Sequence, residues 1–305
     1  MILVLRPGLC DLVMDLGRPG RGALGVPAGG AADPAALAAA NRLAGNPVTA
    51  AGLEIVLSGP TLCFQTGAVV ALTGARFGGA RDSGAPLRWN ETLVLAPGET
   101  LRLDHAEAGA RCWLAVHGGL AVPSILGSGS TFLPGGFGGH QGRALRAGDA
   151  LTAGAGGGKI VLRRARPPVA DVGTALRVLA GPQAGRFDDA GLAAFFGGDY
   201  RVDAASDRRG VRLRGPAVSY PRADWPSQGV LPGAIQIPPD GQPIILGWDG
   251  PVTGGYPLIA AVAAAAGPRL AQLKPGDAVR FETIDRPAVL GMAGSPGQWR
   301  IEDIG

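Results

Sequence analysis

Four short loops contain the polar side chains that could bind a substrate or take part in catalysis. The last loop contains Asp249, Thr253, Gly254, Gly255 and Tyr256. A carboxylate can act as a base, hydroxyls can hydrogen-bond a substrate, and glycine lets backbone N–H groups approach a ligand closely. A Gly- and Pro-rich loop on a sheet is also ordinary turn architecture, so the pattern is compatible with a site and with a structural turn.

Acidic, basic and hydroxyl side chains mark the other three loops. Asp15 and Arg18 could together hold a planar, carboxylate-bearing substrate bidentately, but their spacing alone favours a structural pair that braces the loop. Hydroxyls in a loop can bind a substrate or cap a turn. The two remaining loops are Ser128-x-Ser130-Thr131 and Ser206-Asp207-Arg208 with the nearby Arg212.

A predicted β-hairpin precedes the last of these loops. Residues 234–237 and 243–246 are short apolar runs that contain β-branched side chains. Between them, Pro239 presets its φ angle, Asp240 can bond its own backbone, and Gly241 tolerates a positive φ. The pattern predicts two strands around a tight turn, followed directly by the loop.

Apolar spacing and capping residues predict the other elements. Residues 2–5 form a strand that ends at Pro7-Gly8. Asp33 is a good N-cap and Pro34 suits the first position of a helix. The predicted helices cover residues 35–43, 188–196 and 258–266, and Gly267-Pro268 ends the last of them.

The composition indicates two β-rich domains. A chain of 305 residues is long for one domain, and 52 Gly and 26 Pro among 46% hydrophobic residues imply dense turns between apolar runs. Residues 163–168 are linker-like, so we expect domains at 1–165 and 174–290. Three similar turns precede strands and could close related β domains: Ala96–Glu99, Arg146–Asp149 and Lys274–Asp277.

Charge and apolar patterning exclude several classes of partner. The net charge of +4 is not organised into a basic stripe with aromatic residues, so no nucleic-acid partner is predicted. No apolar run reaches about 20 residues, so no membrane-spanning helix and no membrane partner are expected. Cys10, Cys63 and Cys112 are widely spaced in apolar surroundings, which indicates buried, reduced thiols in a cytoplasmic protein.

Motifs for nucleotide, biotin and metal binding are incomplete. Residues 154–159 lack the first glycine and the final Ser or Thr of a P-loop, and Gly20-x-Gly22-x-x-Gly25 lacks the flanking strand and helix of a dinucleotide fingerprint. Neither lysine has the Met-Lys-Met context of a biotin carrier. His105, His117 and His140 show no metal-ligand spacing, so we expect no metal site.

One long stretch of the sequence resembles a known family. Residues 233–246 are GAIQIPPDGQPIIL, and Asp249 and the string TGGYP at 253–257 follow. This stretch is similar to the signature of the biotin-dependent carboxyltransferase family, which includes the C subunit of 5-oxoprolinase, allophanate hydrolase subunit 2, the KipA proteins and the carboxyltransferase part of urea carboxylase. The resemblance implies a mainly β fold with a few short helices, arranged as two cyclophilin-like β-barrel halves.

The resemblance extends in order over nearly the whole chain. Three positions depart from the family pattern: Met14 replaces a usual Gln, Gly129 replaces a common Arg, and Gln228 stands where an acidic residue is frequent. These departures bear on the choice of substrate. Further blocks that resemble the family are Asp15-Leu16-Gly17-Arg18, Leu126-Gly127-Ser128-x-Ser130-Thr131 and Ser206-Asp207-Arg208-x-Gly210-x-Arg212.

The resemblance implies an enzyme component that is active with partners. The first interpretation is the C subunit of a 5-oxoprolinase, which would hydrolyse the small amide 5-oxoproline to glutamate together with an A-type chain and a B-type (KipI-like) chain. ATP would bind through the complex. One alternative is a carboxyltransferase that moves CO₂ to a urea-like amide from carboxybiotin supplied by a partner. Another is a non-catalytic, KipA-like regulator that binds a KipI-like protein.

The resemblance also implies roles for individual residues. We expect Asp249, Asp15 and Tyr256 to be catalytic, with a carboxylate as base or orienter, and Arg18 and Arg208 to clamp the substrate. Because the two acidic loops lie at opposite ends of the chain, we expect a cleft that uses both halves. The expected substrate-binding residues are Arg18, Ser128, Ser130, Thr131, Arg208, Gln236, Thr253, Gly254 and Gly255.

Overall fold

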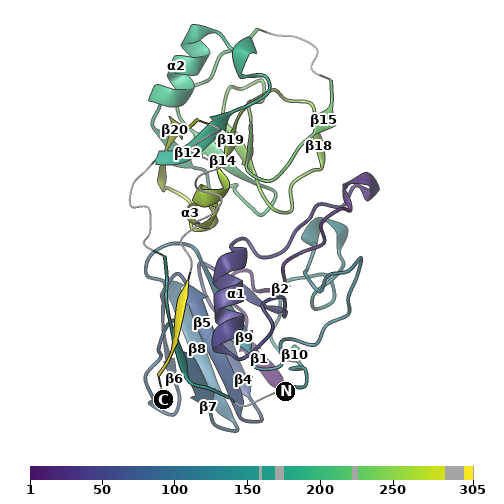
Figure 1. The fold of residues 1–305 in the computed structure, drawn as a ribbon, viewed down its shortest axis with the longest axis vertical. Coiled ribbons are helices and arrows are strands. Elements are labelled where there is room, and N and C mark those ends of the chain that lie inside the picture. Colours follow the sequence, from purple (N-terminus) through teal and green to yellow (C-terminus); the bar gives the residue numbers. More distant parts are fainter. Residues whose placement is uncertain (158–159, 169–174, 222–225, 286–298, 305) are drawn as a thin grey trace. The chain divides into compact units, whose positions relative to one another are not determined.

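The computed structural model describes residues 1–157, 160–168, 175–221, 226–285 and 299–304. Contacts among them define two β-rich units (Figure 1). Described residues within 1–18, 29–168 and 299–304 form the first unit, and those within 19–28 and 175–285 form the second. Strands dominate the described part of the chain, which holds three short α-helices, so the predicted mainly β fold is confirmed.

The first unit consists of two five-stranded sheets with a core between them. Phe64 and Leu101 from one sheet and Leu72 and Leu114 from the other are fully buried in this core. One sheet has the strand order β10 (Ala150–Leu151), β1 (Ile2–Arg6), β4 (Thr61–Phe64), β8 (Glu99–Ala106) and β6 (Phe77–Arg81). The other has the order β2 (Leu12–Met14), β3 (Gly52–Val56), β9 (Arg111–Val116), β5 (Ala68–Gly74) and β7 (Thr92–Leu95).

Helix α1 (Pro34–Leu43) packs on strands β5 and β9 of the second sheet (Figure 1). The carboxylate of Asp33 accepts two hydrogen bonds from backbone N–H groups of the first turn, both at 3.0 Å, as an N-cap should. Small side chains, among them Ala40 on the helix and Ala115 on β9, form a buried cluster at this contact. The predicted helix is confirmed.

The second unit is a closed barrel of seven strands. The predicted hairpin is confirmed: Ile235 pairs with Ile245, and the turn has a hydrogen bond of 2.9 Å from the Gly241 N–H to the Pro238 carbonyl. Helix α2 (Asp189–Gly197) begins after Asp188, as expected. The barrel order is β12 (Ala175–Ala180), β19 (Leu258–Val262), β16 (Ala234–Gln236), β17 (Ile244–Leu246), β14 (Gly210–Arg214), β13 (Tyr200–Val202) and β20 (Ala278–Thr283), which pairs with β12.

The predicted helix over residues 258–266 is wrong. Its first half is strand β19, a 3₁₀ turn covers Ala264–Ala266, and helix α3 (Gly267–Ala271) begins where the helix was expected to end. Strand β19 pairs with both β12 and β16, so its backbone hydrogen bonds are made across the barrel. A continuous apolar run does not distinguish a strand that is buried in this way from a helix.

The linker predicted at residues 163–168 begins instead with a strand, β11 (Arg163–Arg166), which pairs with β21 (Arg300–Asp303). Ala165 is buried, whereas the arginines at the ends of β11 form ion pairs with acidic residues of β21. The expected segments 1–165 and 174–290 leave out β21, which belongs to the first unit.

The three similar turns share one construction. In each, the third residue is a glycine with φ between 81° and 88°, where a side chain is disfavoured. The carboxylate of the fourth residue accepts a hydrogen bond from the backbone N–H of the first. These bonds run from Ala96 to Glu99 at 2.8 Å, from Arg146 to Asp149 at 2.7 Å and from Lys274 to Asp277 at 3.0 Å.

The three cysteines are free thiols. Cys112 is buried, but Cys10 and Cys63 are only partly buried, so the expectation of buried thiols is correct for Cys112 alone. Burial, reinforced by the charges of Asp11 and Glu54, raises the pKa of the Cys112 thiol well above its usual value. Cys112 therefore serves as a neutral core residue rather than a nucleophile.

Candidate functional site

The first cluster joins the end of strand β2 to the loop 125–131. The Asp15 carboxylate accepts hydrogen bonds from the hydroxyls of Ser128 and Ser130 at 2.6 and 2.5 Å. It also accepts hydrogen bonds from the backbone N–H groups of Gly17 and Gly129 at 2.8 and 2.6 Å. Four donors of the protein itself thus engage this carboxylate and fix the geometry of both loops.

Arg18 holds the same loop through different contacts. Its Nε donates a hydrogen bond of 3.3 Å to the Ile125 carbonyl, and its Nη2 donates to the Ser130 carbonyl. The guanidinium carbon lies 5.1 Å from the centre of the Phe137 ring, within the range of a cation–π contact. The residue is 1% exposed, so its guanidinium acts inside the protein.

The second cluster is a buried ion pair in the other unit. Arg208 precedes β14 and Asp249 follows β17, and these strands are neighbours in the barrel. Nε and Nη2 of Arg208 donate hydrogen bonds of 2.8 and 3.1 Å to the two carboxylate oxygens of Asp249. The residues are 8% and 3% exposed, so the pair is a fixed, bidentate brace between the two loops.

The amide of Gln236 lies against the backbone of Gly254. Gln236 is 5% exposed, and its Nε2 has no hydrogen-bond partner among the described residues. A Cβ atom at position 254 would lie 2.3 Å from this nitrogen, so only glycine permits the contact. Thr253 and Gly254 form strand β18 (Thr253–Gly254), which pairs with β15 (Gln228–Gly229). The side chain of Thr253 is exposed beside it.

Tyr256 lies away from the ion pair of Arg208 and Asp249. It is 44% exposed and, with Arg212 and Gln242, lines a cavity of about 170 Å³ beside the hairpin turn. Strands β14 and β17 are antiparallel, so Arg208 and Asp249 lie beyond the other end of these strands. The structure therefore brings Arg208 to Asp249 and Gln236 to Gly254, but it does not join Tyr256 to the ion pair. Gly255 is exposed. The expectation that one cleft is formed by residues of both halves of the chain stays a prediction.

Phe137 belongs to the first cluster although no motif in the sequence pointed to it. The two glycines that follow this ring let the backbone approach the 125–131 loop: a Cβ at Gly138 would lie 2.1 Å from the Ser130 carbonyl oxygen, and one at Gly139 would lie 1.9 Å from the Thr131 hydroxyl. Thr131 itself donates a hydrogen bond of 3.0 Å to the Val13 carbonyl. In the sequence, the one aromatic residue within a run of glycines could have indicated that the backbone packs closely around this ring.

The three departures from the family pattern have local explanations. Met14 is fully buried in β2. A Cβ at Gly129 would lie 2.8 Å from Cγ2 of Val122, so a larger residue requires that side chain to move. Oε1 of Gln228 accepts a hydrogen bond of 2.9 Å from Nε2 of Gln183. A carboxylate at position 228 could accept the same hydrogen bond.

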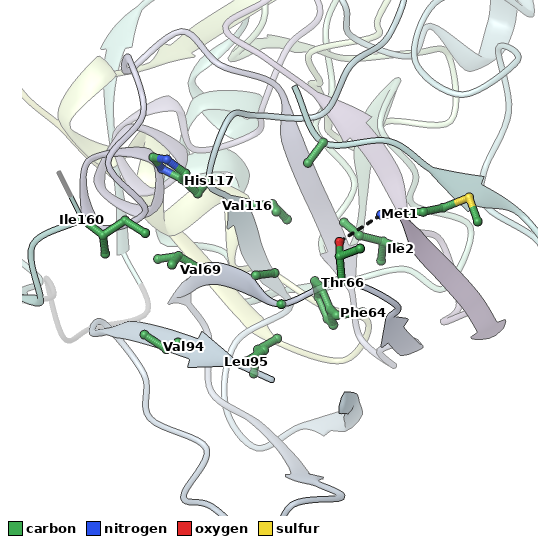
Figure 2. A pocket seen from close by; sticks show the side chains of 13 residues that line it. Met1, Ile2, Phe64, Thr66, Val69, Val94, Leu95, Val116, His117 and Ile160 are labelled. Carbon is green, nitrogen blue, oxygen red and sulfur yellow. Dashed lines mark hydrogen bonds between the residues drawn. The ribbon is translucent and has the colours of Figure 1, made fainter. Parts of the chain in front are cut away.

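Figure 2 shows a second cavity, of about 300 Å³, in the first unit. It is lined mainly by apolar side chains such as Val69, Leu95 and Val116, and none of the predicted site residues lines it. Across the described residues, no group of three or more His, Cys, Asp or Glu side chains is arranged to hold a metal ion. The described helices include none with the length and apolar character of a membrane span.

Asp11 is a buried carboxyl group with a strongly perturbed pKa. Burial raises its pKa to about 6, against the opposing effects of the Gly8 N–H hydrogen bond and the Arg6 charge. Because the folded-state pKa exceeds the unfolded value of 3.8, stability that is present below pH 3.8 is lost as the pH rises through about 6.

Replacing Asp11 with Asn should therefore leave stability nearly unchanged at pH 4 and raise the free energy of unfolding by about 3 kcal/mol at pH 8, because the amide carries no charge to bury. Urea denaturation of both proteins at several pH values measures the difference. A difference that stays constant from pH 4 to pH 8 would show that Asp11 does not titrate in this range.

The comparisons with known proteins define the class of the chain. The family model described as carboxyltransferase domain, subdomain A and B, matches residues 24–283. The chain belongs to this family, and the resemblance found in the sequence is confirmed. It is also similar in structure to the Kluyveromyces lactis urea carboxylase, with a TM-score of 0.87 and 30% identity over 97% of this chain and 28% of that one.

Two relatives are similar in sequence to most of this chain. The chain is 38% identical over 291 residues to the C subunit of 5-oxoprolinase from Escherichia coli (strain K12), a match that covers 92% of this chain and 90% of that protein. It is 32% identical over 307 residues to the urea amidolyase of Lachancea kluyveri, which covers 92% of this chain and 17% of that protein. Both relatives are named as an enzyme or as part of one.

Proposed function

We propose that this chain is the C subunit of a 5-oxoprolinase. The observation that carries the proposal is the similarity to the Escherichia coli C subunit, which extends over nearly the full length of both chains. The chain would act with A-type and B-type chains, and the complex would open the amide ring of 5-oxoproline to glutamate with hydrolysis of ATP. The ATP site would lie outside this chain, because residues 154–159 lack the P-loop pattern.

The contribution of this chain would be recognition of a small amide. We assign substrate hydrogen bonds to the amide of Gln236, whose buried nitrogen can still donate, and to the hydroxyls of Thr253 and Tyr256. Asp15 and Asp249 act as positioning residues, since protein donors engage their carboxylates. In this proposal neither carboxylate is the base that the sequence led us to expect. A partner chain or a water molecule supplies the base instead.

A second candidate is a carboxyltransferase that moves CO₂ from carboxybiotin to a urea-like amide. The structural similarity to urea carboxylase favours it. The chain spans only 28% of that protein, so separate biotin-bearing partners would have to complete the reaction. Gln236, Thr253 and Tyr256 would bind either substrate, because 5-oxoproline and a urea-like amide both present a planar amide group.

Reconstitution distinguishes these candidates. The chain is purified with its A-type and B-type partners, and 5-oxoproline-dependent formation of ADP and glutamate is measured. Omission of this chain should abolish the activity. A parallel assay supplies a biotin carboxylase, a biotin carrier, bicarbonate and urea. Activity in the second assay alone would establish the carboxyltransferase. Tight binding to the B-type chain without either activity would indicate a regulator.

Replacing Gly254 with Ala tests the role of Gln236. The new Cβ must displace the Gln236 amide, and because this amide ends a flexible side chain it can move with little cost to the fold. Activity of the complex should fall as far as it does in Gln236→Ala, and the double variant should be no worse than either single variant. Gly229→Ala, on the paired strand β15, is the control, because a Cβ at this exposed position would meet no atom within 4 Å. Normal activity in folded Gly254→Ala would refute a substrate contact by Gln236.

A further inference from the structure

An arginine outside the two clusters is suited to hold a substrate carboxylate. Arg18 and Arg208 are 1% and 8% exposed, and their guanidinium groups bond protein carbonyls and the Asp249 carboxylate. Arg212 is exposed on strand β14 and borders the cavity of about 170 Å³. Within the described part of the chain, its guanidinium makes no hydrogen bond or ion pair. We propose that Arg212 binds the carboxylate of a small amide in this cavity.

The backbone around Arg212 is held independently of its side chain. The Ser206 hydroxyl accepts a hydrogen bond of 3.0 Å from the Arg212 N–H. The next arginine on the same face of β14, Arg214, is already paired with Asp203 at 2.6 Å. The charge of Arg212 helps to lower the pKa of Asp203, but Asp203 is hydrogen-bonded to Arg214, so the planar fork of Arg212 can take a bidentate ligand.

The cavity itself selects the class of ligand. It is smaller than the roughly 300 Å³ at which pockets for drug-sized ligands begin, so its occupant is a small molecule. The Asp240 carboxylate also borders it, which disfavours multiply charged anions and offers an acceptor for an N–H group. The Tyr256 hydroxyl can donate or accept. A molecule with one carboxylate and an amide N–H matches this set of groups.

The molecule 5-oxoproline has this chemistry, and its choice as the ligand rests on the proposed function. The carboxylate would lie on Arg212 and the ring N–H would face Asp240. Because the carboxylate keeps its charge and its bonds while the neighbouring amide bond breaks, Arg212 would bind the ground state and the transition state about equally. Its loss should then raise KM and leave kcat nearly unchanged.

The binding test compares two ligands on the full chain by calorimetry. One is 5-oxoproline, and the other is 2-pyrrolidone, the same ring without its carboxylate. The wild-type chain should bind 5-oxoproline about 10- to 100-fold more tightly, the range for a hydrogen bond to a charged group. Arg212→Gln should remove this preference. Arg201→Gln, on the neighbouring strand β13 and outside the cavity, should retain it.

The kinetic test uses the reconstituted complex. Arg212→Gln should raise KM for 5-oxoproline about 10- to 100-fold, with kcat changed by less than about twofold, and Arg212→Lys should recover part of the loss. Equal ligand preference in wild type and Arg212→Gln overturns the inference, as does the absence of 5-oxoproline binding by both chain and complex. A complex that does not turn over 5-oxoproline, although the chain shows the Arg212-dependent preference, refutes the proposed function and leaves the carboxylate site standing.

Discussion

Replacing Asp249 with Ala is expected to lower the free energy of unfolding by about 3–5 kcal/mol and to abolish activity of the reconstituted complex. The substitution removes the bidentate acceptor of a guanidinium that is almost fully buried. It also releases the loop that leads to Thr253 and Gly254. Denaturation in urea, followed through the fluorescence of the adjacent Trp248, measures the stability, and ADP release measures the activity.

The double variant Arg208→Met/Asp249→Leu separates stability from function. Replacement of both charges by apolar side chains commonly restores most of the stability that the loss of one partner removes. We expect the double variant to fold well but to stay inactive, because the ion pair also orients the loop. Near-normal activity in the double variant would show that the pair is only a brace. Near-normal turnover in Asp249→Ala would exclude any functional role.

Replacing Asp15 with Ala is expected to cost about 3–5 kcal/mol of stability and most of the activity. The carboxylate accepts four hydrogen bonds, and bonds to charged groups contribute about 1.5–3 kcal/mol each, with losses inside one network not adding simply. Without it, the hydroxyls of Ser128 and Ser130 lose their shared acceptor. The midpoint of urea denaturation should therefore move to a clearly lower concentration.

Matched controls show whether this cost comes from the network. Ser128→Ala should cost only about 1 kcal/mol, because Asp15 keeps its other donors. Asp82→Ala removes an exposed loop carboxylate of the same unit that accepts one hydrogen bond, from the Thr100 N–H, and should cost less than about 1 kcal/mol. If Asp15→Ala denatures at the same urea concentration as Asp82→Ala, the network contributes little to the fold.

Local patterns predicted those elements whose signals lie within a few neighbouring residues. Asp33 with Pro34, and Pro239 with Asp240 and Gly241, specify a helix start and a turn through chemistry confined to a few residues, and the structure confirms both. The strand at 258–262 could not be recognised because long-range pairing with β12 and β16 determines its conformation. Strand β11 was missed for the same reason, since its partner lies at the far end of the chain.

The candidate site was predictable in its residues but not in its partnerships. Sequence motifs selected Asp15, Arg18, Arg208 and Asp249, and all four are engaged in hydrogen-bond networks. No spacing rule indicates that Arg208 pairs with Asp249, 41 positions away, because the pairing depends on the register of β14 against β17. The exposed Arg212 could be distinguished from the buried arginines only after the strand faces were known.

The pairing of β11 with β21 has a consequence for the order of assembly during translation. Residues that precede and follow most of the second unit contribute to the first unit. A chain emerging from the ribosome thus offers all the barrel strands of the second unit before β21. Until β21 arrives, β11 lacks its partner strand, so the first unit is completed only after the barrel strands of the second unit have been made. A stalled or truncated chain would retain an unpaired edge there, the kind of edge that recruits other chains.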